Sequence, residues 1–380
     1  MRELVVLGAG ASGLMAAARL RRRDILILEH NPKPAAKIAI SGGGRCNITN
    51  ERVSRDDYLG DAAFVEKVLH RFDNRALLTF LRRYGLEPVV RKKGQYFCPR
   101  QATELIDLLR KLADHAELAT NVEVLGAERS DAGFHVRTSE GIVHAKRLLV
   151  ASGGLSYASL GASGIGYEIA ERFGHAIMPT RPALVGLTLQ KEQAWMKELA
   201  GVSLPVAITV GRRRIEGDLL FAHKGISGPA VLDASLFWHR GKITIDFLPG
   251  LKLKTVLKHP QRSVLSQLPL PKRFAQAFFE AMAIPQVPYA RMQEHTKQRL
   301  SQLKSYALAP AGTFGFARAE VTKGGVATDA IDPATMQSRL VEGLYFAGEV
   351  MDVTGRLGGY NFQWAFSSAV VAAEAIEKSL

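Results

Sequence analysis

The hydrophobic pattern of the chain begins with two short apolar runs that flank a helical segment. The runs Leu4–Leu7 and Ile25–Leu28 are continuous, as in strands that are buried on both faces of a parallel sheet. The intervening stretch, Leu14–Leu20, is rich in alanine and leucine and favours a helix. Strand, helix and strand in this order predict the first βαβ unit of an α/β domain.

Three glycines, at positions 8, 10 and 13, lie between the first strand and the helix. In this spacing Gly8 permits a tight turn, Gly10 lets the backbone approach a pyrophosphate, and Gly13 lets the helix pack closely against the strand. The second strand ends at Glu29, whose carboxylate can accept hydrogen bonds from a ribose. We interpret this combination as a binding site for FAD. A glycine turn with a purely structural role is the alternative.

Helical and strand-like spacing recurs along the rest of the chain. Helices are predicted at Ala62–His70, Asn74–Tyr84, Thr103–Ala113 and Gly359–Ile376, and strands at Val122–Leu125, Phe134–Thr138, Leu148–Ala151, Leu184–Leu189, Val206–Val210, Ile243–Phe247 and Gly343–Glu349. Between residues 252 and 303, helical segments are interrupted by five prolines.

These patterns predict the domain organisation. Residues 1–183 and 322–380 are assigned to an FAD-binding domain, 184–251 and 304–321 to a β-rich domain, and 252–303 to a basic helical subdomain. The predicted fold class is α/β, with a Rossmann-like FAD-binding domain interrupted by a β-rich, barrel-like domain and a small helical domain.

Composition restricts the class of protein. Hydrophobic residues make up 47% of the 380 residues and charged residues 23%, which excludes a disordered chain. No apolar run reaches the roughly 18 residues that a membrane helix needs, and the N-terminal run stops at Gly8, so we predict a cytoplasmic protein without a membrane segment. The two cysteines, Cys46 and Cys98, are too few for a disulfide scaffold, and no set of metal ligands is apparent.

The charge balance favours a polyanionic partner. The formal net charge is +14, and residues 252–304 hold ten Lys or Arg but only two acidic residues. Residues 67–100 hold nine Lys or Arg against Asp73 and Glu87. Such an excess attracts nucleic acid through long-range forces and counterion release. A solvated basic face without a partner is the alternative.

Four longer motifs carry a family resemblance. They are Ser41–Asn50, Phe221–Pro229, Glu320–Val326 and Gly348–Ala365. With them the chain resembles a family of bacterial FAD-dependent oxidoreductases, also described as aminoacetone oxidase-like, from the first strand to the final helix. It is most similar to members that reduce uridine in ribosomal RNA with NADH. The resemblance implies a nucleotide-binding domain that is interrupted by β-rich and helical domains.

Residues in these motifs are expected to bind FAD. Three successive glycines at 42–44 remove every Cβ from a backbone that can then lie against a flat ring or phosphates, and Arg45 can balance phosphate charge. Gly348 and Glu349 resemble the strand end that holds the ribityl chain in flavoproteins, where Asp is usual. The expected cofactor-binding residues are Gly8, Gly10, Ala11, Ser12, Gly13, Glu29, Lys37, Gly42, Gly43, Gly44, Arg45, Cys46, Asn47, Val124, Ser152, Gly153, Gly348, Glu349, Gly359, Tyr360 and Asn361.

Three side chains are candidates for catalysis. Cys46 stands beside the glycine run and can donate a proton to substrate, Cys98 is a second candidate acid, and His223 lies within a family motif. Packing of small buried cysteines and a structural histidine are the alternatives.

The predicted activity is a two-stage flavin reduction. NADH or NADPH reduces FAD, which then reduces a C=C bond conjugated to a carbonyl. The basic insert favours uridine in ribosomal RNA as substrate, giving dihydrouridine. The alternatives are a small-molecule enone reductase of the dehydro bile acid type, an amine oxidase, and an RNA-binding protein that holds FAD without catalysis.

Overall fold

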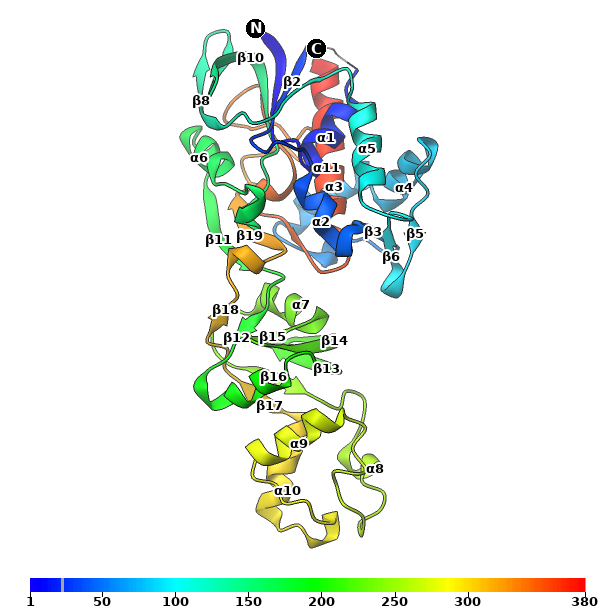
Figure 1. Ribbon diagram of the computed structural model, residues 1–380. Helices are drawn as coiled ribbons and strands as arrows, with labels where there is room; N and C mark the ends of the chain where they lie inside the picture. The colour runs from blue at the N-terminus through cyan, green and yellow to red at the C-terminus, as the bar shows by residue number, and fades with distance from the viewer. Residues whose placement is uncertain (22–23, 380) are drawn as a thin grey trace. The chain divides into compact units, whose positions relative to one another are not determined.

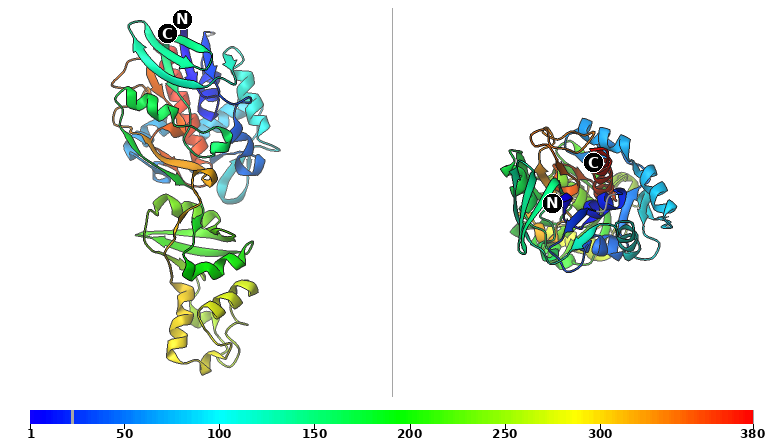
Figure 2. Two further views of the ribbon diagram at one scale, coloured as in Figure 1. Left: turned by 60° about the vertical axis from the view of Figure 1, so that its left-hand side comes forward. Right: turned by 90° about the horizontal axis from the view of Figure 1, so that it is seen from above.

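The computed structural model describes residues 1–21 and 24–379, and the chain divides into two compact units (Figures 1 and 2). One contains Met1–Pro182 and Val321–Leu380, and we call it the Rossmann unit. The other, Ala183–Glu320, is the inserted unit, because the chain leaves the Rossmann unit once and returns once. The fold is mixed α/β, as the sequence predicts.

A seven-stranded sheet forms the centre of the Rossmann unit. Its strands are β1 (Arg2–Leu7), β2 (Ile25–Leu28), β7 (Glu117–Ala119), β8 (Val124–Ser130), β9 (Gly133–Thr138), β10 (Gly141–Val150) and β20 (Leu344–Phe346). They follow the order β7-β2-β1-β10-β9-β8, with β20 paired to β10. β1 pairs in parallel with both β2 and β10, so the carboxyl ends of these three strands meet at one edge. Ligands bind at that edge in open α/β sheets.

Helices pack on this sheet and extend the unit to one side. They are α1 (Ala11–Arg19), α2 (Ala36–Gly44), α3 (Ala62–Arg71), α4 (Asn74–Arg83), α5 (Thr103–Leu112), α6 (Ile165–Arg172) and α11 (Tyr360–Ser379). The predicted helices near residues 62, 74, 103 and 359 are confirmed. α11 runs beside α1 in Figure 1, and its buried Trp364 and Phe366 belong to the same hydrophobic core as the sheet.

Three small sheets complete the Rossmann unit. β3 (Asn47–Asn50), β6 (Gln95–Phe97) and β5 (Val89–Val90) form one, β4 (Tyr58–Leu59) pairs with β21 (Thr354–Gly355), and β11 (Ile177–Ala183) pairs with β19 (Val321–Val326). β11 and β19 adjoin the boundaries with the inserted unit.

The inserted unit contains a second seven-stranded sheet. In spatial order its strands are β17 (Tyr306–Leu308), β16 (Ile243–Asp246), β13 (Ser203–Val210), β14 (Arg213–Ala222), β15 (Gly225–Ser227), β12 (Leu187–Thr188) and β18 (Gly312–Thr313). The hydrogen-bonded path through the described strands is open, with β17 and β18 at its ends. The helices are α7 (Pro229–Phe237), α8 (Leu253–Val256), α9 (Lys272–Ala281) and α10 (Glu294–Ser301).

Aromatic side chains join α9 to this sheet. Phe274 of α9 lies 4.7 Å from Phe247 and 5.6 Å from Phe221, between ring centroids, and all three are buried. Residues of the sheet and of the helical segment therefore share one hydrophobic core. A separate helical subdomain at 252–303 stays a prediction. Within the described residues, no helix is both long and apolar enough to cross a membrane.

Candidate cofactor site

The glycine turn after β1 has three different kinds of surroundings. Gly8 has a φ of +99°, and a Cβ there would lie 2.8 Å from the Ala151 carbonyl oxygen. A Cβ on Gly13 would lie 1.9 Å from the Gly8 carbonyl oxygen, so helix and strand touch at this position. A Cβ on Gly10 would meet no atom within 4 Å. The space over Gly10 is open, as the approach of a pyrophosphate requires.

The N-terminus of α1 opens onto the same space. Gly10 caps the helix without a side-chain hydrogen bond, and the first turn holds no acidic residue. Its backbone amides are therefore suited to an anion. Gly348 adjoins this turn, because a Cβ there would lie 2.1 Å from Ser12 Oγ. The glycine turn and the C-terminal motif thus meet at Ser12.

Glu29 is fixed at the end of β2. The residue is buried, and its two carboxylate oxygens accept hydrogen bonds from the amides of Ala9 and Asn31, each at 2.9 Å. The carboxylate therefore lies directly beside the glycine turn, at the carboxyl end of the strand. Its contact with a ribose stays a prediction, as does a contact at Val124, the first residue of β8.

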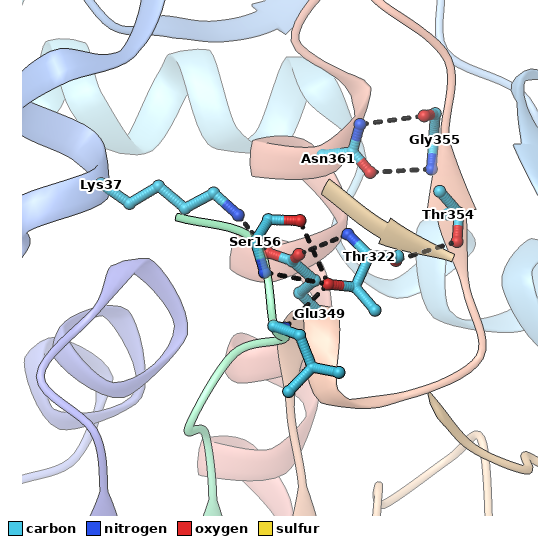
Figure 3. Close-up of polar contacts among 8 residues, drawn as sticks. Lys37, Ser156, Thr322, Glu349, Thr354, Gly355 and Asn361 are labelled. Carbon is cyan, nitrogen blue, oxygen red and sulfur yellow. Dashed lines mark hydrogen bonds and ion pairs between the residues drawn. The ribbon is translucent and has the colours of Figure 1, made fainter. Parts of the chain in front are cut away.

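Glu349 joins segments that lie far apart in the sequence (Figure 3). Lys37 Nζ donates to Glu349 Oε2 at 2.6 Å, and the Thr322 amide donates to Oε1 at 2.8 Å. Thr322 Oγ1 in turn accepts hydrogen bonds from the amides of Leu155 at 2.8 Å and Ser156 at 3.2 Å. The network holds the Glu349 carboxylate in place with one cation and one backbone amide, as expected for a residue that orients a polar ligand.

The last helix meets the glycine-rich motif near its N-terminus. Asn361 binds both backbone groups of Gly355, at 2.8 and 2.9 Å, which fixes the turn that leads into α11 (Figure 3). Asn50 Nδ2 donates to the Gly358 carbonyl at 3.1 Å. At Gly359 φ is +95°, and a Cβ would lie 2.6 Å from the Thr49 carbonyl, so only glycine fits there. Tyr360 begins α11 itself.

The three glycines of the Ser41–Asn50 motif all have positive φ, from +57° to +80°. Gly42 packs against the Phe97 ring, 3.0 Å from the position of a Cβ, whereas Gly43 has open space. Arg45 is exposed. Asn47 Nδ2 donates to Gln95 Oε1 at 2.8 Å. The segment therefore depends on glycine for its backbone conformation, and it is hydrogen-bonded to β6. Gly43 and Arg45 are its residues that a ligand can reach.

The end of β10 supplies two further predicted residues. Gly153 has a φ of +77° and no atom within 4 Å of a Cβ position, as at Gly10. Ser152 is packed more tightly, because its Oγ would lie 2.1 Å from a Cβ on Gly166. Gly153 is therefore the residue of this pair with free space beside it.

The structure separates the three catalytic candidates. Cys46 and Cys98 are both fully buried, and their thiols are hydrogen-bonded to one another. Burial raises the pKa of the Cys46 thiol well above its usual range, so it stays protonated and unreactive. The hydrogen bond with Cys46 lowers the pKa of the Cys98 thiol, so for Cys98 it is full burial alone that favours the packing alternative. His223 is exposed in the turn between β14 and β15 of the inserted unit.

The motifs correspond to a known family. The family model described as HI0933-like protein Rossmann domain matches residues 2–375. The chain belongs to the HI0933-like family. Its fold and its glycine-lined space identify the Rossmann unit as that of an FAD-type oxidoreductase.

Two curated relatives carry the same name. The chain is 39% identical to the ribosomal RNA dihydrouridine synthase of Escherichia coli K12, over 98% of this chain and 97% of the relative. It is 36% identical to the protein of that name from Haemophilus influenzae, over 99% and 98%. A third relative, the 3-dehydro-bile acid delta(4,6)-reductase of Clostridium scindens, is 32% identical over 99% of both chains.

Solved structures share the fold at low identity. A quinol fumarate reductase from E. coli has a TM-score of 0.50 at 14% identity, with 99% of this chain and 70% of that chain covered. The 3-ketosteroid delta1-dehydrogenase of Sterolibacterium denitrificans has a TM-score of 0.50 at 13% identity, with 100% and 99% covered.

Sequence reasoning assigned no role to Thr322 or Ser156. Both contribute to the network around Glu349. The one sequence signal for such a role is that Thr322 lies within the Glu320–Val326 motif. The spacing of Thr322 and Ser156 along the chain does not indicate a contact with Glu349.

Proposed function

We propose that this chain is an FAD-dependent reductase that uses NADH to convert uridine in ribosomal RNA to dihydrouridine. The observation that carries the proposal is its 39% identity, over nearly the whole of both chains, to a ribosomal RNA dihydrouridine synthase. The second relative of the same name supports it. Ribosomal RNA as substrate implies a cytoplasmic protein.

The residues of the Rossmann unit fit FAD. The open backbone at Gly10 and the uncapped start of α1 would bind the pyrophosphate. The Glu349 carboxylate would accept a hydrogen bond from a ribityl hydroxyl. The start of α11 would face the pyrimidine end of the flavin and stabilise negative charge there. When bound, FAD supplies hydride transfer, from NADH to the flavin and from the flavin to the electron-poor carbon of uracil.

A proton must also reach the neighbouring carbon of the substrate. The buried pair of Cys46 and Cys98 is poorly placed to give it, because neither side chain is exposed. Of the three predicted candidates, His223 is the one whose side chain is exposed. His223 belongs to the inserted unit, and its role as the acid stays a prediction.

Basic residues of the inserted unit would bind the RNA backbone. Among the described residues, five cations of this segment are exposed and form no ion pair: Lys252, Lys254, Lys258, Arg262 and Arg291. Lys304 differs, because it pairs with Asp246 at 2.8 Å. Exposed cations without an ion-pair partner are the ones best able to bind RNA phosphates, because their binding releases counterions from the RNA.

The decisive experiment is mass spectrometry of ribosomal RNA from a strain that lacks the protein. We expect loss of a two-hydrogen mass increment on one uridine, and its return when purified protein, NADH and that RNA are combined. RNA that is unchanged by the deletion would contradict the proposal.

Electron entry is tested by steady-state kinetics. The sequence has one GxGxxG fingerprint, so NADH is expected to bind transiently beside the flavin and to leave as NAD before the substrate reacts. Parallel double-reciprocal lines are expected. Replacing NADH by NADPH in the same assay determines the preferred donor.

A small-molecule enone reductase is the second candidate. The observation that favours it is the 32% identity to a dehydro-bile acid reductase over 99% of both chains. Both candidates reduce a C=C bond conjugated to a carbonyl. Turnover of a steroid enone without RNA, together with no turnover of RNA, would select this candidate.

A further inference from the structure

The hairpin of β5 and β6 has a strongly basic tip. Residues 89–97 contain three Lys or Arg and no acidic residue. The Arg91 amide closes the turn by donating to the Gln95 carbonyl at 2.8 Å. Arg91 and Lys93 are exposed, and within residues 1–21 and 24–379 neither forms an ion pair. Glu51 lies beside Gly94 of this turn, but the three cations of residues 89–97 outnumber it, so the tip keeps a net positive charge.

This hairpin is built against the segment that is expected to bind FAD. β6 pairs with β3, with Phe97 opposite Asn47. The Phe97 ring fills the space beside Gly42, and Gln95 accepts the hydrogen bond from Asn47. The basic tip and the glycine run are therefore parts of one hydrogen-bonded piece of structure. An anionic polymer that binds the tip would be held beside the flavin.

Aromatic side chains accompany the basic ones. The Arg91 guanidinium lies over the Phe97 ring, 5.8 Å from its centroid, and Tyr96 and Phe97 are both partly exposed. Arginine planes and aromatic rings are the groups on which unpaired bases stack in complexes with single-stranded RNA. A simple inorganic anion would need the charges but not the rings.

We propose that this hairpin binds single-stranded RNA and holds its backbone beside the FAD-binding segment. Arg91 and Lys93 contact phosphates, and the exposed edge of the Arg91–Phe97 stack contacts an unstacked base. This inference rests on the proposed function, which supplies RNA as the substrate. The hairpin belongs to the Rossmann unit, whereas the basic residues 252–304 belong to the inserted unit.

The test compares two variants with equal loss of charge. The hairpin variant, Arg91→Gln/Lys93→Gln, removes two positive charges from the tip. The control variant, Arg110→Gln/Lys111→Gln, removes two exposed positive charges from the last turn of α5. The probe is ribosomal RNA from a strain that lacks the protein. For the hairpin variant we expect RNA affinity to fall on the order of tenfold, and the slope of log affinity against log salt to flatten by roughly 1 per contact. The α5 variant should keep the wild-type slope.

A charge-conserving variant and the flavin spectrum complete the design. Arg91→Lys/Lys93→Arg should keep the salt slope, and FAD absorbance should report that each variant is folded. A wild-type slope in the hairpin variant, or an equal loss in the α5 variant, would overturn the inference. So would a raised KM for NADH with unchanged RNA affinity, because the tip would then serve the dinucleotide. If wild-type protein forms no dihydrouridine, the proposed function itself fails, which is a separate result.

Discussion

The Rossmann unit and the inserted unit differ in where their chemistry lies. In the Rossmann unit, glycines with open space beside them and the carboxylates of Glu29 and Glu349 come from distant motifs and are fixed by backbone contacts. In the inserted unit the aromatic core holds the fold together, and the groups able to meet a substrate are exposed side chains such as His223. A cofactor site requires particular residues at fixed spacing, so a sequence motif can identify it. A surface that binds phosphates requires only positive charge, which many different sequences supply.

The largest expected effect tests whether the two units fold separately. Phe274→Ala removes a fully buried ring at the centre of the inserted unit's aromatic core and should destabilise that unit by about 3–5 kcal/mol. We expect denaturant to unfold the inserted unit first, as followed by circular dichroism, while FAD stays bound to the Rossmann unit. FAD release that shifts together with this transition would mean that the units unfold as one.

The next effect concerns the open space at Gly10. The backbone there, with φ −82° and ψ −161°, is available to any residue, and a Cβ meets no protein atom. Gly10→Val should therefore fold normally yet lose FAD affinity by at least about 100-fold, or about 2.7 kcal/mol, because the side chain occupies the pyrophosphate's approach. Gly10→Ala should lose less. A folded valine variant with stoichiometric FAD would refute the assignment.

A smaller effect separates two neighbouring cations of the inserted unit. Lys272 and Arg273 begin α9. The Arg273 guanidinium donates to the carbonyls of Glu198 and Ala200, so it connects the helix to the segment that precedes β13. Arg273→Ala should cost about 1 kcal/mol in unfolding. Lys272→Ala should leave stability unchanged and, if it contacts a phosphate, flatten the salt slope of RNA binding by roughly 0.7 to 0.9. Equal stability losses would contradict this distinction.

The sequence predicted the Rossmann unit well where the cause is local. Gly8, Gly10 and Gly13 act within one turn, and each has the surroundings that its place in the spacing requires. The role of Thr322 was not predictable in this way. Its partners Glu349 and Ser156 lie 27 and 166 positions away, and only the tertiary fold brings them together.

β14 in the inserted unit shows a second limit. Its buried positions Ile215, Leu219 and Phe221 alternate with exposed ones, but Gly217 and the exposed Leu220 interrupt the apolar–polar pattern, and the strand was not predicted. The structure explains the glycine, because α7 packs over it: a Cβ there would lie 3.3 Å from the Ala230 amide. Burial of Cys46 and Cys98 likewise depends on packing from other segments, which residue type alone does not determine.

The smallest expected effect is a difference in pH dependence between the units. His175 of the Rossmann unit is 2% exposed and contacts Ser338 Oγ through Nε2 at 2.8 Å. Burial lowers the pKa of His175, whereas the four histidines of the inserted unit, His223, His239, His259 and His295, are exposed. The contribution of neutral His175 to stability is therefore complete above the unfolded pKa of about 6.5.

As the pH falls below that value, the unfolded chain takes up a proton that the folded Rossmann unit resists, so the free energy of unfolding decreases until the lowered pKa is reached. We expect the denaturant concentration at the unfolding midpoint of the Rossmann unit to decrease as the pH is lowered from 7.5 to roughly 5.5. The change in the inserted unit should be smaller. His175→Gln should reduce this dependence, because an amide can keep a hydrogen bond to Ser338 without titrating. The exposed His144→Gln is the matched control. A pH dependence that survives in His175→Gln would assign the effect to other groups.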